Sequence, residues 1–169
     1  MIPKPRKRDL TSHRSWRPIS LLSCLGKGLE RLIARRLAWV SIEEGVLHHQ
    51  QGEALPKRSA VDLAAALIHD IDRALDSGKV ATLVTMDIQG AFDSVLRKRL
   101  IFRLREQGWP IQLVKWVDSF MSSRSARVRF KETTTDDLPL HCGLPQGSPI
   151  SPILFLLYTQ PIYRLGEQQ

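Results

Sequence analysis

Residues 85–93 read TMDIQGAFD and follow an apolar, β-branched run that begins at Val80. A Ser-Gly turn signal precedes that run, and together they predict a strand over Val80–Met86. Asp87 then falls where the chain leaves a sheet, and a carboxylate is costly to bury there unless it is paired or binds a cation. Asp87 is therefore a candidate metal ligand, with helix capping as the simpler alternative, and Asp93 is a candidate cap for the next helix.

A second informative stretch is GLPQGSPISP at residues 143–152. Its glycines and prolines surround Gln146, just before an apolar helix predicted over Ile153–Tyr163 with Ser151 as its cap. Glycine lets a ligand approach the backbone closely, and exposed backbone N–H groups bind anions. A rigid turn without a ligand explains the same composition, so both interpretations remain open.

The rest of the chain predicts a mixture of helices and one hairpin. Apolar residues recur at three- and four-residue steps, and a capping box of Ser59 and Asp62 followed by Gly78 marks the limits of one helix. The predicted helices cover 24–41, 59–77, 95–107 and 110–121, and the predicted hairpin pairs 126–130 with 138–142. Strands and helices do not alternate regularly, which favours an α+β fold over a doubly wound sheet.

Composition narrows the class of protein. The 169 residues suit one domain, and a net charge of +8 favours a polyanionic partner such as nucleic acid, although a merely solvated basic surface has the same composition. Two cysteines without a CxxC pair argue against a disulfide scaffold or a zinc site and fit an intracellular, reducing compartment. No apolar run reaches the ~20 residues that a membrane span requires.

Taken together, these stretches resemble the reverse transcriptase family. DxxxAFD at 87–93 is similar to the first catalytic motif of that family, and the loop at 143–155 is similar to its second palm motif. Further matches are IPKP at 2–5, WRPISLL at 16–22, GKxLE at 26–30 and LPKRSAVDL at 55–63. The order of the motifs agrees over essentially the whole chain. The sequences of these motifs are most similar to those of the non-LTR (LINE-type) retrotransposon branch, and a group II intron maturase is the alternative branch.

The resemblance implies a right-hand polymerase fold. Residues 1–79 would be mainly fingers and connecting helices, residues 80–169 part of the palm, and the thumb would be absent. The implied activity is RNA-directed DNA synthesis, in which a deoxynucleotide joins a primer 3′-hydroxyl with the help of two Mg²⁺ ions. The implied partners are an RNA template, a DNA primer and deoxynucleoside triphosphates.

The resemblance also implies roles for individual residues around the reacting phosphate. Asp87 would bind both metal ions, and the backbone carbonyl of Ile88 would add a ligand. Arg17 would grip the triphosphate through paired hydrogen bonds, with Lys4 in a similar role. Phe92 would lie under the sugar and exclude a 2′-hydroxyl.

Other implied contacts involve the base and the template. Gln146 and Gly147 would lie against the incoming nucleotide and the template. Lys57 and Arg58 would face the template backbone, with a solvated basic surface as the alternative.

One departure from the family pattern affects activity. The third palm motif, with two adjacent aspartates, should follow the Ile153–Tyr163 helix, but the only such pair, Asp136-Asp137, precedes the loop at 143–152. One carboxylate would then have to hold two mutually repelling cations. We therefore expect no polymerase activity from this polypeptide alone, and a catalytically dead nucleic-acid-binding remnant is the alternative function.

Overall fold

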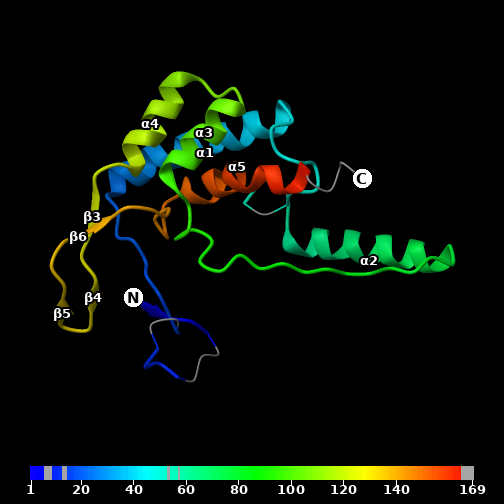
Figure 1. Ribbon diagram of the computed structural model, residues 1–169, viewed down its shortest axis with the longest axis horizontal. Helices are drawn as coiled ribbons and strands as arrows, with labels where there is room; N and C mark the ends of the chain where they lie inside the picture. The colour runs from blue at the N-terminus through cyan, green and yellow to red at the C-terminus, as the bar shows by residue number, and fades with distance from the viewer. Residues whose placement is uncertain (6–8, 13–14, 53, 57, 165–169) are drawn as a thin grey trace.

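The computed structural model describes residues 1–5, 9–12, 15–52, 54–56 and 58–164. Four helices form one bundle, and a fifth, α2, lies outside it (Figure 1). The helices are α1 (Cys24–Glu43), α2 (Ala60–Asp76), α3 (Arg97–Glu106), α4 (Ile111–Met121) and α5 (Ser151–Arg164). Together with three small sheets, they give the described residues a mixed α and β content, as the sequence predicts.

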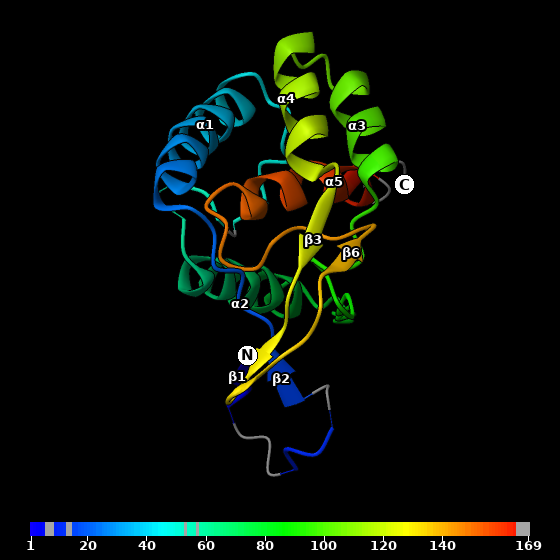
Figure 2. The same cartoon turned by 90° about the vertical axis from the view of Figure 1, so that its left-hand side faces the viewer.

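The hydrophobic core forms where α5 packs against α3 and α1, and α4 packs against α3 on the same side of α5 (Figure 2). Leu154 and Leu157 of α5 are fully buried, and they lie in the apolar run ILFLLY at 153–158 of that helix. Leu100 and Leu104 of α3 are also fully buried. Val114, Val117 and Leu37 complete the packing from α4 and α1. The burial of this continuous apolar surface is the main driving force that holds the bundle together.

Helix ends follow the local sequence signals in part. The Ser59 hydroxyl and the Asp62 carboxylate form the predicted capping box of α2, and Gly78 ends that helix with φ +70°. The expectation that α3 begins at Val95 with Asp93 as its cap is wrong. The helix begins at Arg97 with Leu96 as an N-cap that makes no side-chain hydrogen bond. The Asp93 carboxylate instead accepts a hydrogen bond from Gln146, and the Val95 carbonyl accepts one from the Gly143 N–H. Ser151 lies inside α5, so its hydroxyl is not the predicted cap.

The strands are short and pair as antiparallel ribbons. β1 (Ile2–Pro3) pairs with β2 (Trp16–Arg17). A hairpin forms where the sequence predicts one, but the predicted pairing of 126–130 with 138–142 is wrong in detail. Its pairs are β3 (Arg124–Ala126) with β6 (Leu138–Leu140) and β4 (Arg129–Phe130) with β5 (Thr133–Thr134), so part of the predicted turn is a strand. The edge of the Trp16 ring meets Phe130 with centroids 4.9 Å apart, so the first ribbon contacts the tip of the hairpin.

The predicted strand over Val80–Met86 is wrong. This segment runs back beneath α2 toward the bundle (Figure 1), and no described strand pairs with it. Because a strand is stabilised by hydrogen bonds to a neighbour, an apolar, β-branched sequence alone does not make one. Val80 and Met86 are 92% and 84% exposed, which makes the segment an aggregation hazard.

Helix α2 is amphipathic but buries none of its residues. Its apolar stripe, which includes Val61, Leu67 and Ile68, faces solvent. Among the described residues, none of the helices combines the length and apolar character of a membrane span. The stability of the folded chain therefore comes from the bundle around α5 rather than from α2.

Replacing matched leucines tests this division. Leu104→Ala in α3 should lower the free energy of unfolding by about 2–5 kcal/mol, because it leaves a cavity in a fully buried site. Leu67→Ala in α2 should cost less than about 1 kcal/mol, because Leu67 is 43% exposed. Urea unfolding followed by circular dichroism measures both. Equal losses would show that α2 is packed as tightly as α3.

Candidate functional site

The two informative stretches of sequence meet through their backbones. The Gly143 N–H donates to the Val95 carbonyl and the Leu144 N–H donates to the Phe92 carbonyl, both at 2.8 Å. Gly143 has φ +87°, and a Cβ at this position would lie 3.2 Å from both Cα and O of Asp93. Glycine therefore permits both the backbone conformation and the close approach of the two segments.

The loop at 143–148 also contacts the N-terminal part of the chain. The Ser20 N–H donates to the Gln146 carbonyl at 2.8 Å, and a Cβ at Gly147 would lie 3.4 Å from the Ser20 carbonyl oxygen. The Gln146 side chain donates to Asp93 Oδ1 at 3.4 Å, which is a long hydrogen bond. Gln146 is thus held by its backbone on one side and aims its amide at the other segment.

A buried carboxylate fixes the end of this loop to α1. The Ser148 hydroxyl donates to Glu30 Oε2, and the two residues are only 4% and 6% exposed. A carboxylate removed from water needs such a hydrogen bond to offset its lost hydration. Glu30 therefore acts as an anchor for Ser148.

Arg124 supports the start of the loop, and sequence reasoning missed it. Its guanidinium donates to the carbonyls of Gly143 at 2.6 Å and Cys142 at 3.3 Å. Burial lowers the pKa of Arg124 from its ordinary value. A single arginine in a hairpin strand carries no sequence signal for this role, because its acceptors are backbone groups distant in sequence.

Phe92 lies between this site and the core. Its half-buried ring meets Phe155 of α5 with centroids 5.4 Å apart and planes at 64°. This edge-to-face geometry is favourable for aromatic pairs. The contact with α5 therefore holds the Phe92 ring in one orientation.

Asp87 and Ile88 lie in the exposed segment that leads into Phe92. Within the described residues, the Asp87 carboxylate makes no hydrogen bond or ion pair, and no three acidic, histidine or cysteine side chains gather closely enough to hold a metal. Carboxylate and carbonyl oxygens are suitable Mg²⁺ ligands, so Asp87 and Ile88 have the right chemistry. The described residues do not, however, complete a site for two ions.

The predicted triphosphate ligands lie on the first ribbon. Arg17 belongs to β2 and is exposed, while the Lys4 N–H donates to the Ser15 carbonyl at 2.8 Å, directly after β1. Ser20, which contacts Gln146, follows Arg17 by three residues. The fold thus places Lys4 and Arg17 on one ribbon. The residues that follow β2 contact the loop at 143–148 through Ser20.

The predicted template contacts are only partly visible. Lys57 lies outside the described residues. Arg58 is described, and its Nη1 donates to the His49 carbonyl at 2.6 Å and to the Gln51 carbonyl. The guanidinium of Arg58 therefore ties the loop before α2 together.

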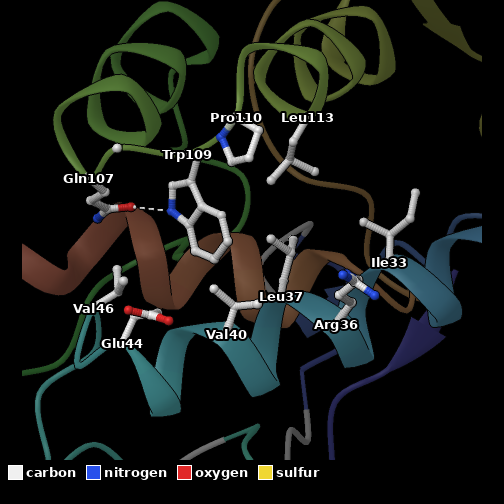
Figure 3. Close-up of a pocket in the computed structure, with 11 residues that line it drawn as sticks. Ile33, Arg36, Leu37, Val40, Glu44, Val46, Gln107, Trp109, Pro110 and Leu113 are labelled. Carbon is white, nitrogen blue, oxygen red and sulfur yellow. Dashed lines mark hydrogen bonds between the residues drawn. The ribbon is translucent and has the colours of Figure 1, made fainter.

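A separate groove lies between α1 and the turn from α3 to α4. Its volume is about 720 Å³, and side chains such as Leu37, Val40 and Trp109 make it largely apolar (Figure 3). The Trp109 indole N–H donates to Gln107 Oε1 at 3.1 Å. None of the residues that the sequence singled out for chemistry lines this groove.

Comparison with known proteins assigns the motifs to a family. Residues 2–169 match the family model described as reverse transcriptase (RNA-dependent DNA polymerase). The chain is 34% identical over 159 residues to a probable RNA-directed DNA polymerase from transposon BS of Drosophila melanogaster, covering 94% of this chain and 17% of the relative. It is 31% identical over 160 residues to the RNA-directed DNA polymerase from mobile element jockey of the same species, with the same two shares.

A third relative belongs to another element. The chain is 29% identical over 156 residues to the Pol polyprotein of the type-1 retrotransposable element R2 of Popillia japonica, covering 89% of this chain and 21% of the relative. The chain therefore spans about a fifth or less of the length of these relatives.

Two glycines with positive φ test the close approach at Gly143. Gly45→Ala should cost about 1 kcal/mol, because φ is +62° there but no atom lies within 4 Å of the added Cβ. Gly143→Ala should cost about 1–3 kcal/mol more, because its Cβ would press on the Asp93 backbone. Urea unfolding measures the free energies. Equal costs would show that the two segments do not approach as closely as described.

Proposed function

The chain belongs to the reverse transcriptase (RNA-dependent DNA polymerase) family, and we propose that it forms part of the polymerase domain of a non-LTR retrotransposon protein. The observation that carries this proposal is the backbone pairing of Gly143 and Leu144 with Val95 and Phe92. It joins two segments that are distant in sequence and that both resemble catalytic motifs. The names of the relatives favour the retrotransposon branch over an intron maturase.

The proposed architecture divides the chain at residue 80, where the exposed segment after α2 begins. Residues 1–79 are mainly fingers and connecting helices, residues 80–169 are part of the palm, and the thumb lies outside the chain. The Ser20–Gln146 and Glu30–Ser148 hydrogen bonds join the first part to the second around one loop.

In the proposed reaction, a primer 3′-hydroxyl displaces pyrophosphate from a deoxynucleoside triphosphate opposite an RNA template. Arg17 and Lys4 bind the triphosphate, which suits their position on one ribbon leading to the loop. Phe92 lies against the sugar and excludes a 2′-hydroxyl, which its packing against Phe155 supports, because a held ring cannot retreat.

The remaining proposed contacts position the base and the template. Gln146 and Gly147 lie against the nucleotide and the template. The hydrogen bond from the Ser20 N–H to the Gln146 carbonyl supports this position, and Gly147 follows directly in the chain. Lys57 and Arg58 face the template backbone. For Arg58, the hydrogen bonds to two carbonyls leave this role to the remaining N–H groups of the guanidinium.

Asp87 and the Ile88 carbonyl are the proposed ligands for Mg²⁺. When bound, two such ions would activate the attacking oxygen and stabilise the leaving pyrophosphate. With one carboxylate available, the mutual repulsion of two dications is poorly offset. We therefore propose that residues 1–169 are inactive alone. The two adjacent aspartates of the third palm motif would come from a longer protein.

The net charge of +8 supports a second candidate, a catalytically dead module that still binds nucleic acid. The two candidates differ in one respect only. The polymerase proposal requires that Asp87 contribute to nucleotide addition once the domain is complete, whereas the binding module does not.

Primer extension on an RNA template separates the candidates. The purified chain should give no extension with Mg²⁺ and deoxynucleotides. A chimera in which the chain replaces its matching segment of the jockey polymerase should extend the primer. Asp87→Asn in the chimera should lower the rate by at least about 100-fold, because it removes a metal ligand.

Asp70→Asn is the matched control, since Asp70 is an exposed carboxylate on α2 and has no proposed role. It should leave the rate of the chimera unchanged. Extension by the chain alone would contradict the proposed inactivity. Equal rates for the two variants would contradict the role of Asp87 and favour the binding module.

A further inference from the structure

Helix α3 carries an unusual excess of positive charge on its outer side. Its ten residues, RKRLIFRLRE, include five cations and one acid, while Leu100, Ile101 and Leu104 bury the inner side. Arg99 and Arg103 stand four residues apart, and like charges at that spacing destabilise a helix. A surface that served solubility alone would gain from mixed charge, so the pattern points to an anionic partner.

Neighbouring acids neutralise only part of this charge. Arg97 pairs with Asp118 of α4 and Arg103 pairs with Glu106, each at 2.7 Å. The hydrogen bond from Arg97 lowers the pKa of Asp118, and Arg105 adds a smaller attraction. Among the described residues, Lys98, Arg99 and Arg105 make no ion pair.

These charges surround a hollow between α3 and α4, which we call the α3–α4 hollow. It has a volume of about 440 Å³ and is lined by Arg97, Lys98, Ile101, Phe102, Arg105 and Asp118. Three cations face one carboxylate there, so the lining is net positive. Phe102 is 56% exposed, although it lies on a helix whose other face reaches the core.

We propose that the α3–α4 hollow binds single-stranded RNA outside the polymerase site. Cations bind phosphates, and an exposed ring stacks on a base that is not already stacked in a duplex. Lys98 and Arg105 contact successive phosphates, and Phe102 stacks on the intervening base. The partner is RNA because the family acts on RNA and single-stranded RNA presents unpaired bases.

This site is separate from the proposed polymerase site. None of its lining residues belongs to the loop at 143–148, to the segment at 87–95 or to the first ribbon. The polymerase proposal does not require it, and it gives the nucleic-acid-binding candidate a defined site, because a chain without polymerase activity would still bind RNA there.

Fluorescence anisotropy with a labelled 12-nucleotide oligouridine tests the proposal on the intact chain. Lys98→Ala with Arg105→Ala should weaken binding about tenfold or more at 0.1 M salt. The slope of log K against log[salt] should become shallower by about 1.4, because two phosphate contacts are lost. Phe102→Ala should weaken binding about fivefold or more with an unchanged slope, because stacking releases no counterions.

The control is Arg73→Ala with Lys79→Ala. It removes the same charge from exposed positions at the end of α2, on the other side of α5 from α3 (Figure 2), and should change affinity less than twofold. Circular dichroism confirms that each variant is folded. Equal losses of RNA affinity in the two double variants would show that binding depends on net charge alone, and would overturn the proposal.

Two competitors test the identity of the ligand. A 12-base-pair RNA duplex should compete poorly, because its bases are already stacked. Equal competition by the duplex would overturn the stacking role of Phe102. A 12-nucleotide oligothymidylate that binds more tightly than the RNA would overturn the assignment to RNA.

Discussion

The site depends on the close approach of two backbones at Gly143. The N–H groups of Gly143 and Leu144 donate to carbonyls at Val95 and Phe92, and a side chain at Gly143 would separate the segments. This contact spans nearly fifty residues of intervening chain, and α3 and α4 within that chain provide much of the core. Packing of the bundle and assembly of the site are therefore coupled.

Local signals in the sequence predicted local structure well. The capping box at Ser59, the helix stop at Gly78 and the presence of a hairpin were foreseen, because each depends on residues close together in the chain. The pairing within that hairpin and the caps expected at Asp93 and Ser151 were not. The strand over Val80–Met86 was not, because strand formation needs a partner that no described segment supplies.

The same limit applies to the candidate site. Sequence motifs identified Phe92 and Gln146, whose segments the fold brings together, but not Arg124 or the contact between Glu30 and Ser148. Those contacts join positions that no local pattern links. The two proposed functions also make different demands: polymerase chemistry would need carboxylates beside the loop at 143–148, and the proposed RNA binding would use cations on α3.

The central proposal is that Asp87 helps to hold a cation beside the loop at 143–148, against which a deoxynucleotide lies. Paramagnetic broadening by Mn²⁺ in the presence of a deoxynucleoside triphosphate tests this directly, because it detects even weak and transient binding. The account predicts that amide resonances of residues 87–93 and 143–148 broaden first. Broadening centred on Asp70, Asp72 and Asp76 of α2, with the loop at 143–148 unchanged, would contradict it.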